Sequence, residues 1–364
     1  MSETNLFKPI QIGPLTLPHR LTMAPLTRLR GTPSRTPTPL MTQYYSQRSS
    51  TPGTLIIAEG TLISYASGGG FPGAPGIWSA EQIKAWKAVT SEVHRKGGFI
   101  FCQLFAMGRA ADEVGAQREG IEVIAPSAIP KEEGAAVPRE MSVEEVKETM
   151  KDFVQAAKNV IEAGFDGVEV HGANGYLTDQ FLQDVSNQRQ DEYGGNVENR
   201  SRFLHEILAG VVDAVGAERV GLRLSPFSRF SGMGMEDPIP QFSDIIVKAR
   251  QLDLAYLHLV ESRVAGAVDT ERTESLEFAY KLWDGPLLIA GGYTPERARK
   301  LVDEEHPEKN IVVVFGRHFI SNPDLVFRVK EGVEFAKYDR DTFYTCLPEG
   351  YVDYPFSPKY VEAA

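Results

Sequence analysis

Three side chains that can hold or protonate a reacting group lie within one short stretch, His171-Gly172-Ala173-Asn174-Gly175-Tyr176. A histidine and an asparagine can both donate hydrogen bonds to one carbonyl oxygen that gains negative charge. A tyrosine hydroxyl can act as a general acid. In the structural alternative, His171 and Asn174 only shape a turn and Tyr176 packs in the core. The presence of all three groups in one loop favours a catalytic role.

Two glycine-containing pairs late in the chain have the chemistry of a phosphate site. Gly291-Gly292 ends one apolar run and Gly316-Arg317 ends the next. Glycines allow the backbone to approach a ligand closely, and the Arg317 side chain adds a positive charge. A Gly-Gly pair alone can equally mark a tight turn. Taken together, the two pairs predict a site for a small phosphate.

Two further polar residues interrupt apolar runs. Arg223 lies in the run 219–225, and a buried arginine needs an anionic or polar partner. That partner is either Glu169 or Glu59 in a structural ion pair, or a ligand on which negative charge develops. Gln103 is either a core amide or a group that reads the edge of a planar heterocycle. The residues alone leave both choices open.

The elements that must position these groups are short, almost continuously apolar runs, which are typical of strands covered on both faces in a parallel sheet. They are 21–25, 54–60, 99–104, 165–171, 219–225, 254–260, 286–292 and 311–317. Segments with helical periodicity lie between them, at 81–96, 143–162, 197–215, 242–252, 276–283, 295–304 and 324–331. The clearest helix follows Ser142, which with Glu145 has the spacing of a capping box.

Eight strands that alternate with helices predict a (β/α)8 barrel, the TIM barrel, as a single domain that comprises residues 1–364. A doubly wound sheet is the rival fold, but no GxGxxG follows the first strand. Residues 9–20 resemble a hairpin around Gly13-Pro14. Two polar insertions, 106–139 and 183–199, follow the third and fourth strands and are expected over the active-site face. Barrel sites form where strands end, and those ends carry Thr27, Glu59, Gly60, Gln103, His171, Arg223, Glu261, Gly291, Gly292, Gly316 and Arg317.

The composition argues against several classes of protein. Lys plus Arg number 38 and Asp plus Glu number 49, and the net charge of −11 disfavours nucleic acid or an anionic membrane as partner. The only cysteines, Cys102 and Cys346, exclude a disulfide framework, and no metal-binding pattern occurs. The polar, mixed N-terminal residues predict no signal peptide, and no apolar run approaches the roughly 18 residues of a membrane span. We therefore expect a cytoplasmic protein with a small-molecule partner and no metal.

The chain resembles the old yellow enzymes, a family of FMN-dependent ene-reductases, along nearly its whole length. The resemblance is closest to the fungal branch, which includes chanoclavine-aldehyde reductases and isomerases of ergot-alkaloid pathways. The matching motifs are Leu6-Phe7-Lys8-Pro9, Ala24-Pro25-Leu26-Thr27-Arg28, Tyr44-Tyr45-Ser46-Gln47-Arg48, Glu59-Gly60, Gln103-Leu104, the stretch 171–176, DEYGGNVENR at 191–200, LRLSP at 222–226, Phe315-Gly316-Arg317, FISNPDL at 319–325, KYDRDTFY at 337–344 and YVDYP at 351–355.

This resemblance implies noncovalent FMN and a set of residues around it. Thr27 would hydrogen-bond the flavin C4 carbonyl oxygen, Gln103 and Arg223 would contact the pyrimidine edge, and Arg317 would bind the phosphate. The full implied cofactor set is Pro25, Leu26, Thr27, Gly60, Gln103, Arg223, Gly291, Gly292, Phe315, Gly316 and Arg317.

The resemblance also implies the reaction. NADPH (or NADH) would pass hydride through flavin N5 to the activated C=C bond of an α,β-unsaturated carbonyl or nitro compound. His171 and Asn174 would hold the substrate oxygen, Tyr176 would supply the proton, and Phe105 and Tyr344 would shape the substrate pocket. Phe105 stands where many relatives have Trp. Tyr176 stands where some ergot-pathway relatives have Phe, which favours reduction.

Other functions remain open at this level. An ene-isomerase or a pathway-specific reductase of a secondary metabolite would use the same fold and cofactor. An aldolase or phosphosugar isomerase would need a phosphate site without flavin, and a Schiff-base lysine is missing from the strand ends. A noncatalytic flavin-binding protein would not need the His171, Asn174 and Tyr176 set. The sequence is compatible with a monomer or a homodimer.

Overall fold

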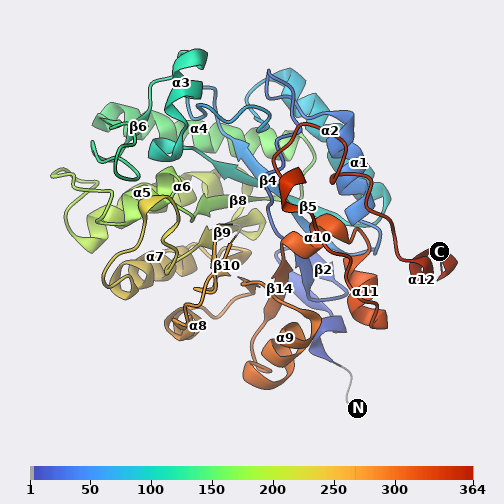
Figure 1. Ribbon diagram of the computed structural model, residues 1–364. Coiled ribbons are helices and arrows are strands. Elements are labelled where there is room, and N and C mark those ends of the chain that lie inside the picture. Colours follow the sequence, from blue (N-terminus) through green and yellow to red (C-terminus); the bar gives the residue numbers. More distant parts are fainter. Residues whose placement is uncertain (1–3, 267, 364) are drawn as a thin grey trace.

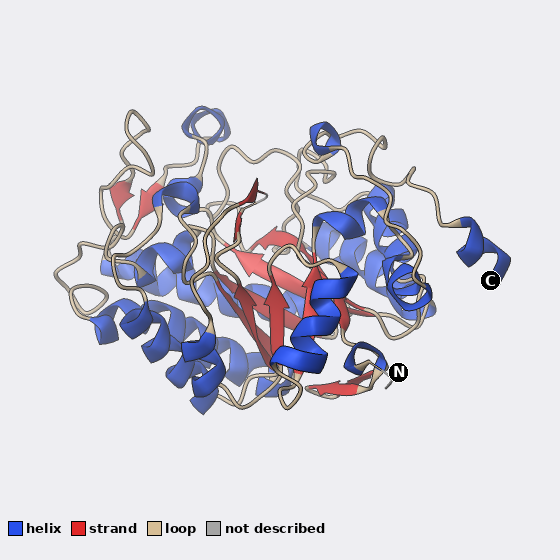
Figure 2. Ribbon diagram, turned by 60° about the horizontal axis from the view of Figure 1, so that its bottom comes forward, coloured by secondary structure: helices blue, strands red, loops and turns tan. Residues whose placement is uncertain are grey.

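Parallel strands close into a barrel in the computed structural model, which describes residues 4–266 and 268–363. Around the barrel each strand pairs with its neighbour in chain order, and β14 pairs with β3 to close the ring. The barrel strands are β3 (Leu21–Met23), β4 (Leu55–Leu62), β5 (Phe99–Phe105), β8 (Gly167–Gly172), β9 (Val220–Leu224), β10 (Tyr256–Val260), β13 (Leu287–Ala290) and β14 (Ile311–Phe315). The prediction of a (β/α)8 barrel is confirmed (Figure 2).

Helices surround the strands, as Figures 1 and 2 show. Those that cover the barrel are α1 (Pro39–Arg48), α2 (Ala80–Arg95), α4 (Val143–Glu162), α6 (Val197–Val215), α7 (Ile239–Gln251), α8 (Glu277–Leu282), α9 (Pro295–Lys300) and α11 (Leu325–Glu331), and shorter additions are α3 (Glu113–Glu119), α5 (Leu177–Leu182), α10 (Arg317–Ser321) and α12 (Pro358–Ala363). Single 3-10 turns occur at Asn5–Phe7, Gly108–Ala110, Ala217–Arg219, Phe230–Gly232 and Arg340–Thr342, and a π-helical turn at Leu301–Glu305 follows α9. Within the described ranges, no helix combines the length and apolar character needed to cross a bilayer.

The periodicity predicts all the barrel-covering helices except α1. The predicted capping box of α4 is present, because Ser142 accepts from Glu145 N and Glu145 accepts from Ser142 N. Helix α1 lacks an apolar stripe, since its buried face consists of Met41, two tyrosines and Arg48. Tyrosines and an arginine at helical spacing do not register as an amphipathic pattern, although here they fill the core.

Strand alternation separates the two largest parts of the core. Residues that point outward from the strands pack against the helices, whereas a smaller apolar cluster that includes Leu55, Phe101 and Val312 fills the barrel interior. The predicted hairpin is present as β1 (Ile10–Ile12) and β2 (Leu15–Leu17), and both strands contribute to the interior cluster. The hairpin therefore covers the amino-terminal end of the barrel, opposite the strand ends where a site is expected.

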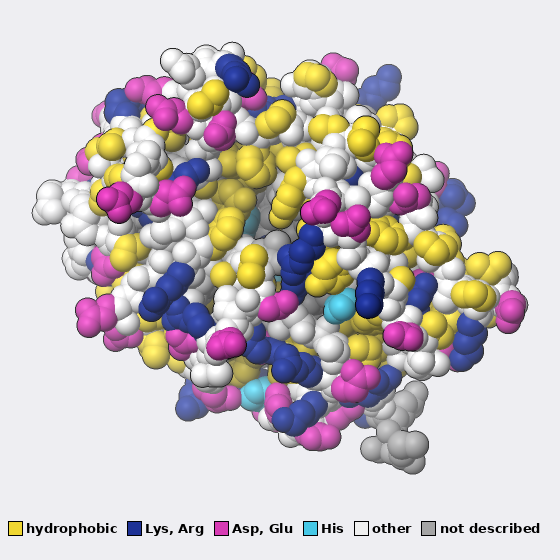
Figure 3. Space-filling view, viewed as in Figure 1, with side chains coloured by type: hydrophobic (Ala, Val, Ile, Leu, Met, Phe, Trp, Pro, Cys, Tyr) yellow, Lys and Arg dark blue, Asp and Glu magenta, His cyan; other side chains and the backbone are white. Residues whose placement is uncertain are grey.

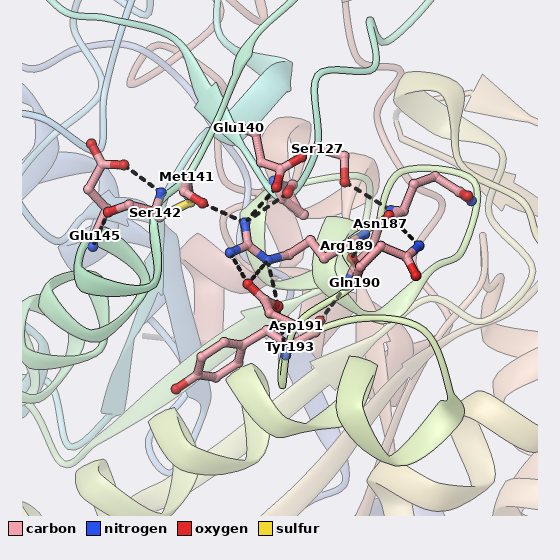
Figure 4. Close-up of polar contacts among 12 residues, drawn as sticks. Ser127, Glu140, Met141, Ser142, Glu145, Asn187, Arg189, Gln190, Asp191 and Tyr193 are labelled. Carbon is pink, nitrogen blue, oxygen red and sulfur yellow. Dashed lines mark hydrogen bonds and ion pairs between the residues drawn. The ribbon is translucent and has the colours of Figure 1, made fainter.

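Arg189 ties the two predicted insertions to each other. This side chain, in 183–199, is buried and donates from Nη1 to the carbonyl oxygens of Pro126 (3.0 Å) and Met141 (2.6 Å), while Nε bonds Asp191. Gln188 N also donates to Ser127 Oγ at 2.9 Å. Figure 4 shows Arg189 between these two segments. Short strands β6 (Ile124–Ala125) and β7 (Arg139–Glu140) add a parallel pair.

Buried arginines fix the segment that follows α11 to the barrel. Arg30 donates to the carbonyl oxygens of Thr342 (3.0 Å), Phe343 (2.8 Å) and Leu347 (3.1 Å), and its guanidinium lies over the Tyr351 ring. Irregular backbone needs donors when it is buried, because its carbonyl groups have no ladder partners. Arg30 supplies them and thereby fixes the segment that carries Tyr344.

The Arg30 contacts lead to a test of this role. The change Arg30→Met should leave the bonded carbonyl groups without a donor and lower the free energy of unfolding by about 1–3 kcal/mol. Hydrogen exchange should accelerate first in residues 341–350. Arg35→Met is the matched control, since Arg35 is equally buried but bonds Phe71 O and Glu119. Equal acceleration of residues 341–350 in both variants would contradict the assignment.

Candidate functional site

A cavity of about 580 Å³ opens at the carboxyl ends of the barrel strands. This size is typical of a site for a cofactor or substrate. Figure 3 shows the molecule from the side of these strand ends, with a hollow near the middle and hydrophobic side chains around it. The predicted site residues that line the cavity are Pro25, Leu26, Thr27, Gln103, His171, Asn174, Tyr176, Arg223, Gly291, Gly292, Gly316, Arg317 and Tyr344. The fold therefore brings together residues that are distant in the sequence.

Two of the predicted strand-end residues, Glu59 and Glu261, lie outside this lining and bond to Tyr45 and Tyr293, respectively. Three residues of the implied cofactor and substrate sets also lie outside it. Phe105 packs edge-on against Tyr176, with the ring centroids 5.0 Å apart, and a Cβ added to Gly60 would lie 3.1 Å from Phe105 Cε1. Phe315 belongs to the outer cluster, because Val314 before it takes the inward position on β14. Contacts of Gly60, Phe105 and Phe315 with a cofactor or substrate stay predictions.

Loops form the rim of the cavity, and the hydrophobic periodicity of the sequence did not identify them as site segments. Among the described residues, the lining includes Phe71, Phe230, Val264 and Val268, and includes none from 106–139 or 183–199. The two insertions instead bond to each other through Arg189. A phenylalanine between glycines, as in Gly68-Gly69-Gly70-Phe71-Pro72-Gly73, was the one sequence signal for such a rim position. Hydrophobic periodicity cannot detect isolated aromatic residues in loops.

Hydrogen bonds from buried side chains shape the loop after β8. Asn174 has φ of +57°, a left-handed conformation that asparagine tolerates better than most residues. Asn174 N donates to Ser225 Oγ and Gly175 N donates to Asp179 Oδ2, both at 2.8 Å, while Gln180 Nε2 donates to Gly175 O at 2.7 Å. Sequence reasoning missed Asp179 and Gln180, because their role is to hold the loop from inside α5. The result places His171, Asn174 and Tyr176 on one wall of the cavity.

Burial sets the protonation states on this wall. Burial, together with the positive charge of Arg223, lowers the pKa of His171 well below its ordinary value, so the imidazole is neutral at neutral pH. Burial raises the pKa of Tyr176 to about 12, so its hydroxyl keeps the proton. The two rings are neighbours, with centroids 5.0 Å apart. The wall thus offers hydrogen-bond donors and a proton without a formal charge of its own.

Several polar atoms at the cavity are buried and have no partner within residues 4–266 and 268–363. They include His171 Nδ1, Asn174 Oδ1 and Arg223 Nε. Buried polar atoms in proteins are almost always hydrogen-bonded. Arg223, which the sequence left between an ion pair and a ligand contact, lines the cavity with this unpaired nitrogen. A bound group with polar edges would satisfy these atoms.

The opposite end of the cavity has the character of an anion site. Gly292 has φ of +65° beside Arg317, whose Nη1 bonds Asp269 Oδ2 at 2.8 Å. Asp269 belongs to a hairpin of β11 (Val264–Ala265) and β12 (Val268–Asp269) that the sequence did not predict. A Cβ added to Gly292 would lie 3.2 Å from Asp269 Oδ1, so a carboxylate already lies against this corner. The hydrogen bond with Asp269 raises the pKa of Arg317 and keeps it charged.

These features fit FMN. The cation and glycines at one end suit a phosphate, and the unpaired donors and acceptors at the other end suit a ring with polar edges. The residues that would hold the phosphate are Gly291, Gly292, Gly316 and Arg317, and those that would contact the ring are Thr27, Gln103 and Arg223.

Comparison with curated proteins identifies the relatives of this chain. A family model described as the NADH:flavin oxidoreductase / NADH oxidase family matches residues 5–335. A probable inactive reductase of Epichloe festucae var. lolii is 50% identical over 371 residues, which cover 99% of this chain and 97% of that protein. A chanoclavine-I aldehyde reductase of Penicillium roqueforti (strain FM164) is 48% identical over 364 residues, with 99% and 98% coverage.

Solved structures agree with this grouping. Old Yellow Enzyme from Pichia sp. AKU4542 is 38% identical with a TM-score of 0.91 and covers 98% of this chain and 95% of its own. The old yellow enzyme homologue from Zymomonas mobilis is 39% identical with a TM-score of 0.88, with 96% and 99% coverage. The chain therefore belongs to the NADH:flavin oxidoreductase / NADH oxidase family, as an NAD(P)H-dependent oxidoreductase of the old yellow enzyme type with FMN as cofactor.

Proposed function

We propose that this enzyme reduces the activated C=C bond of α,β-unsaturated carbonyl or nitro compounds. The observation that carries the proposal is the uncharged wall of His171, Asn174 and Tyr176 beside the cavity. Bound FMN supplies the hydride, which NAD(P)H provides in turn. The remaining work of the reaction falls to this wall and to the residues that hold the flavin.

The substrate oxygen binds between His171 and Asn174. Their hydrogen bonds stabilise the negative charge that develops on this oxygen when the β-carbon accepts hydride. Because His171 is neutral, it stabilises the oxygen without protonating it. Tyr176 donates its proton to the α-carbon, and the high pKa of its hydroxyl keeps that proton available across neutral and mildly alkaline pH. Thr27, Gln103 and Arg223 orient the flavin ring, and the lining aromatic residues Phe71, Phe230 and Tyr344 contact the substrate body.

A pathway-specific reductase or isomerase is the second candidate. The similarity to a chanoclavine-I aldehyde reductase favours a secondary metabolite as substrate. One relative is named a probable inactive reductase, so turnover has to be measured for this chain. We expect one NADPH to be oxidised for each alkene consumed, since Tyr176 is present to complete a reduction. Absorbance measures NADPH and chromatography measures product in the same reaction. Product formation without loss of NADPH would instead identify an isomerase.

Removal of the Tyr176 hydroxyl tests the proton donor. Tyr176→Phe should leave the reduction of the bound flavin by NADPH unchanged and slow its reoxidation by a simple enone by roughly 100-fold or more, as expected for loss of a general acid. Stopped-flow absorbance separates the two half-reactions. Reoxidation by molecular oxygen serves as an internal control, because it does not need the substrate wall. Equal slowing of both half-reactions would refute the assignment.

Removal of the Arg317 cation tests the phosphate corner. Arg317→Ala should weaken FMN binding by roughly 10- to 100-fold, the value of a charge-assisted hydrogen bond, and leave riboflavin binding unchanged because riboflavin has no phosphate. Asp269→Asn is the matched control, since it keeps Arg317 and removes the competing carboxylate, and it should bind FMN at least as tightly as the wild type. Fluorescence quenching measures each affinity. The same loss for both flavins would contradict a phosphate contact.

A further inference from the structure

A cluster of buried polar side chains lies inside the barrel, one layer below the cavity. Glu169 on β8 is fully buried and accepts hydrogen bonds from Gln103 Nε2 at 2.7 Å, from His258 Nδ1 at 2.8 Å and from Tyr256 OH at 3.1 Å. Gln103 lines the cavity, whereas Glu169, Tyr256 and His258 do not. An ionised carboxylate in a barrel interior is costly unless its lone pairs are satisfied. Its presence there needs an explanation beyond packing.

The carboxylate determines which end of the Gln103 amide faces the cavity. An ionised carboxylate can only accept hydrogen bonds, so the amide nitrogen of Gln103 must point toward Glu169. Gln103 Oε1 is then directed away, and it lies 3.5 Å from the position of a Cβ on Gly60. The cavity floor therefore presents an acceptor, which suits an N–H group at the edge of a planar ring.

The carboxylate also offsets the charge of Arg223. Burial lowers the pKa of Arg223, and the charge of Glu169 opposes this effect. Burial alone would raise the pKa of Glu169, but the contacts with His258, the charge of Arg223 and the hydrogen bond from Gln103 outweigh it and hold this pKa below its ordinary value. Burial lowers the pKa of His258; the charge of Glu169 opposes this effect and the charge of Arg223 adds to it, and the net result is a lowered pKa. His258 is thus neutral, with its proton on the nitrogen that faces Glu169.

We propose that Glu169 is a positioning residue that fixes the orientation of Gln103 and that, by compensating the charge of Arg223, sets the reduction potential of the bound flavin. The inference rests on the proposed placement of the flavin ring against these two residues. Hydride transfer from NAD(P)H brings two electrons and one proton to the ring, and therefore adds one negative charge there. Arg223 stabilises that charge, and Glu169 limits how strongly it does so.

Glu169→Gln removes the negative charge and keeps the size of the side chain. The dissociation constant of oxidised FMN, divided by that of reduced FMN, should rise about tenfold or more. This change corresponds to a reduction potential about 30 mV more positive for a two-electron couple. Titration against a reference dye measures the potential, and thermal unfolding checks the fold. Tyr256→Phe is the matched control, because it removes one hydrogen bond to Glu169 and keeps the charge. Its ratio should stay within about twofold of the wild type.

The outcomes separate this inference from the proposed function. An unchanged or more negative potential in Glu169→Gln overturns the role of Glu169, even if the wild type reduces enones. A wild type that reduces no activated alkene overturns the proposed function and leaves the potentials to decide the role of Glu169. Should Glu169→Gln not fold, Glu169→Asp keeps the charge on a shorter chain. It should shift the visible absorption band of the flavin, as Gln103 loses its fixed orientation, and leave the potential near the wild-type value. A clearly shifted potential in Glu169→Asp contradicts the charge-based account.

Discussion

The need to satisfy charge inside the barrel governs the arrangement of this site. The lower interior is apolar, but the layer beneath the cavity holds Glu169 and the layer above it holds Arg223, neither of which tolerates burial without partners. Strand register brings the compensating groups together. Gln103 lies beside Glu169 across β5 and β8 and donates a hydrogen bond to it, while Arg223 lies between His171 and His258 of its two neighbouring strands and has its charge compensated by Glu169. A slip of one residue in any of these strands would turn the side chains to the helix side and leave the charges unmatched.

Buried arginines also hold the loops above the barrel in place. Arg30, Arg48 and Arg189 each donate to main-chain carbonyl groups of distant segments. A planar guanidinium with five donors can bond to several irregular backbone segments at once, which a lysine ammonium cannot do with the same geometry. These arginines let long loops stay ordered without regular secondary structure. The segment that carries Tyr344 and the insertions around Arg189 are both fixed in this way.

Much of the fold could be predicted because its signals are local. A buried parallel strand appears as a short apolar run, and all the barrel strands were found in this way, with ends that differ by a few residues from the observed ones. The hairpin β1–β2 followed from Gly13-Pro14, and α4 from its apolar stripe and cap. Helix α1 was missed because tyrosines and an arginine form its buried face. The hairpin β11–β12 was missed because two-residue strands leave no periodicity.

For the site, residue types and strand positions were enough to identify the groups that we propose carry the chemistry: His171, Asn174 and Tyr176 in one loop, and Arg317 beside a glycine at a strand end. Their identity follows from residue type and strand position, which are local properties. What surrounds these groups follows from the fold. The neutral state of His171, the retained proton of Tyr176, the pairing of Arg317 with Asp269 and the link from Gln103 to Glu169 all arise from burial and from contacts between distant segments. Desolvation and charge pairing depend on what lies nearby in space, and spacing along the chain does not encode that.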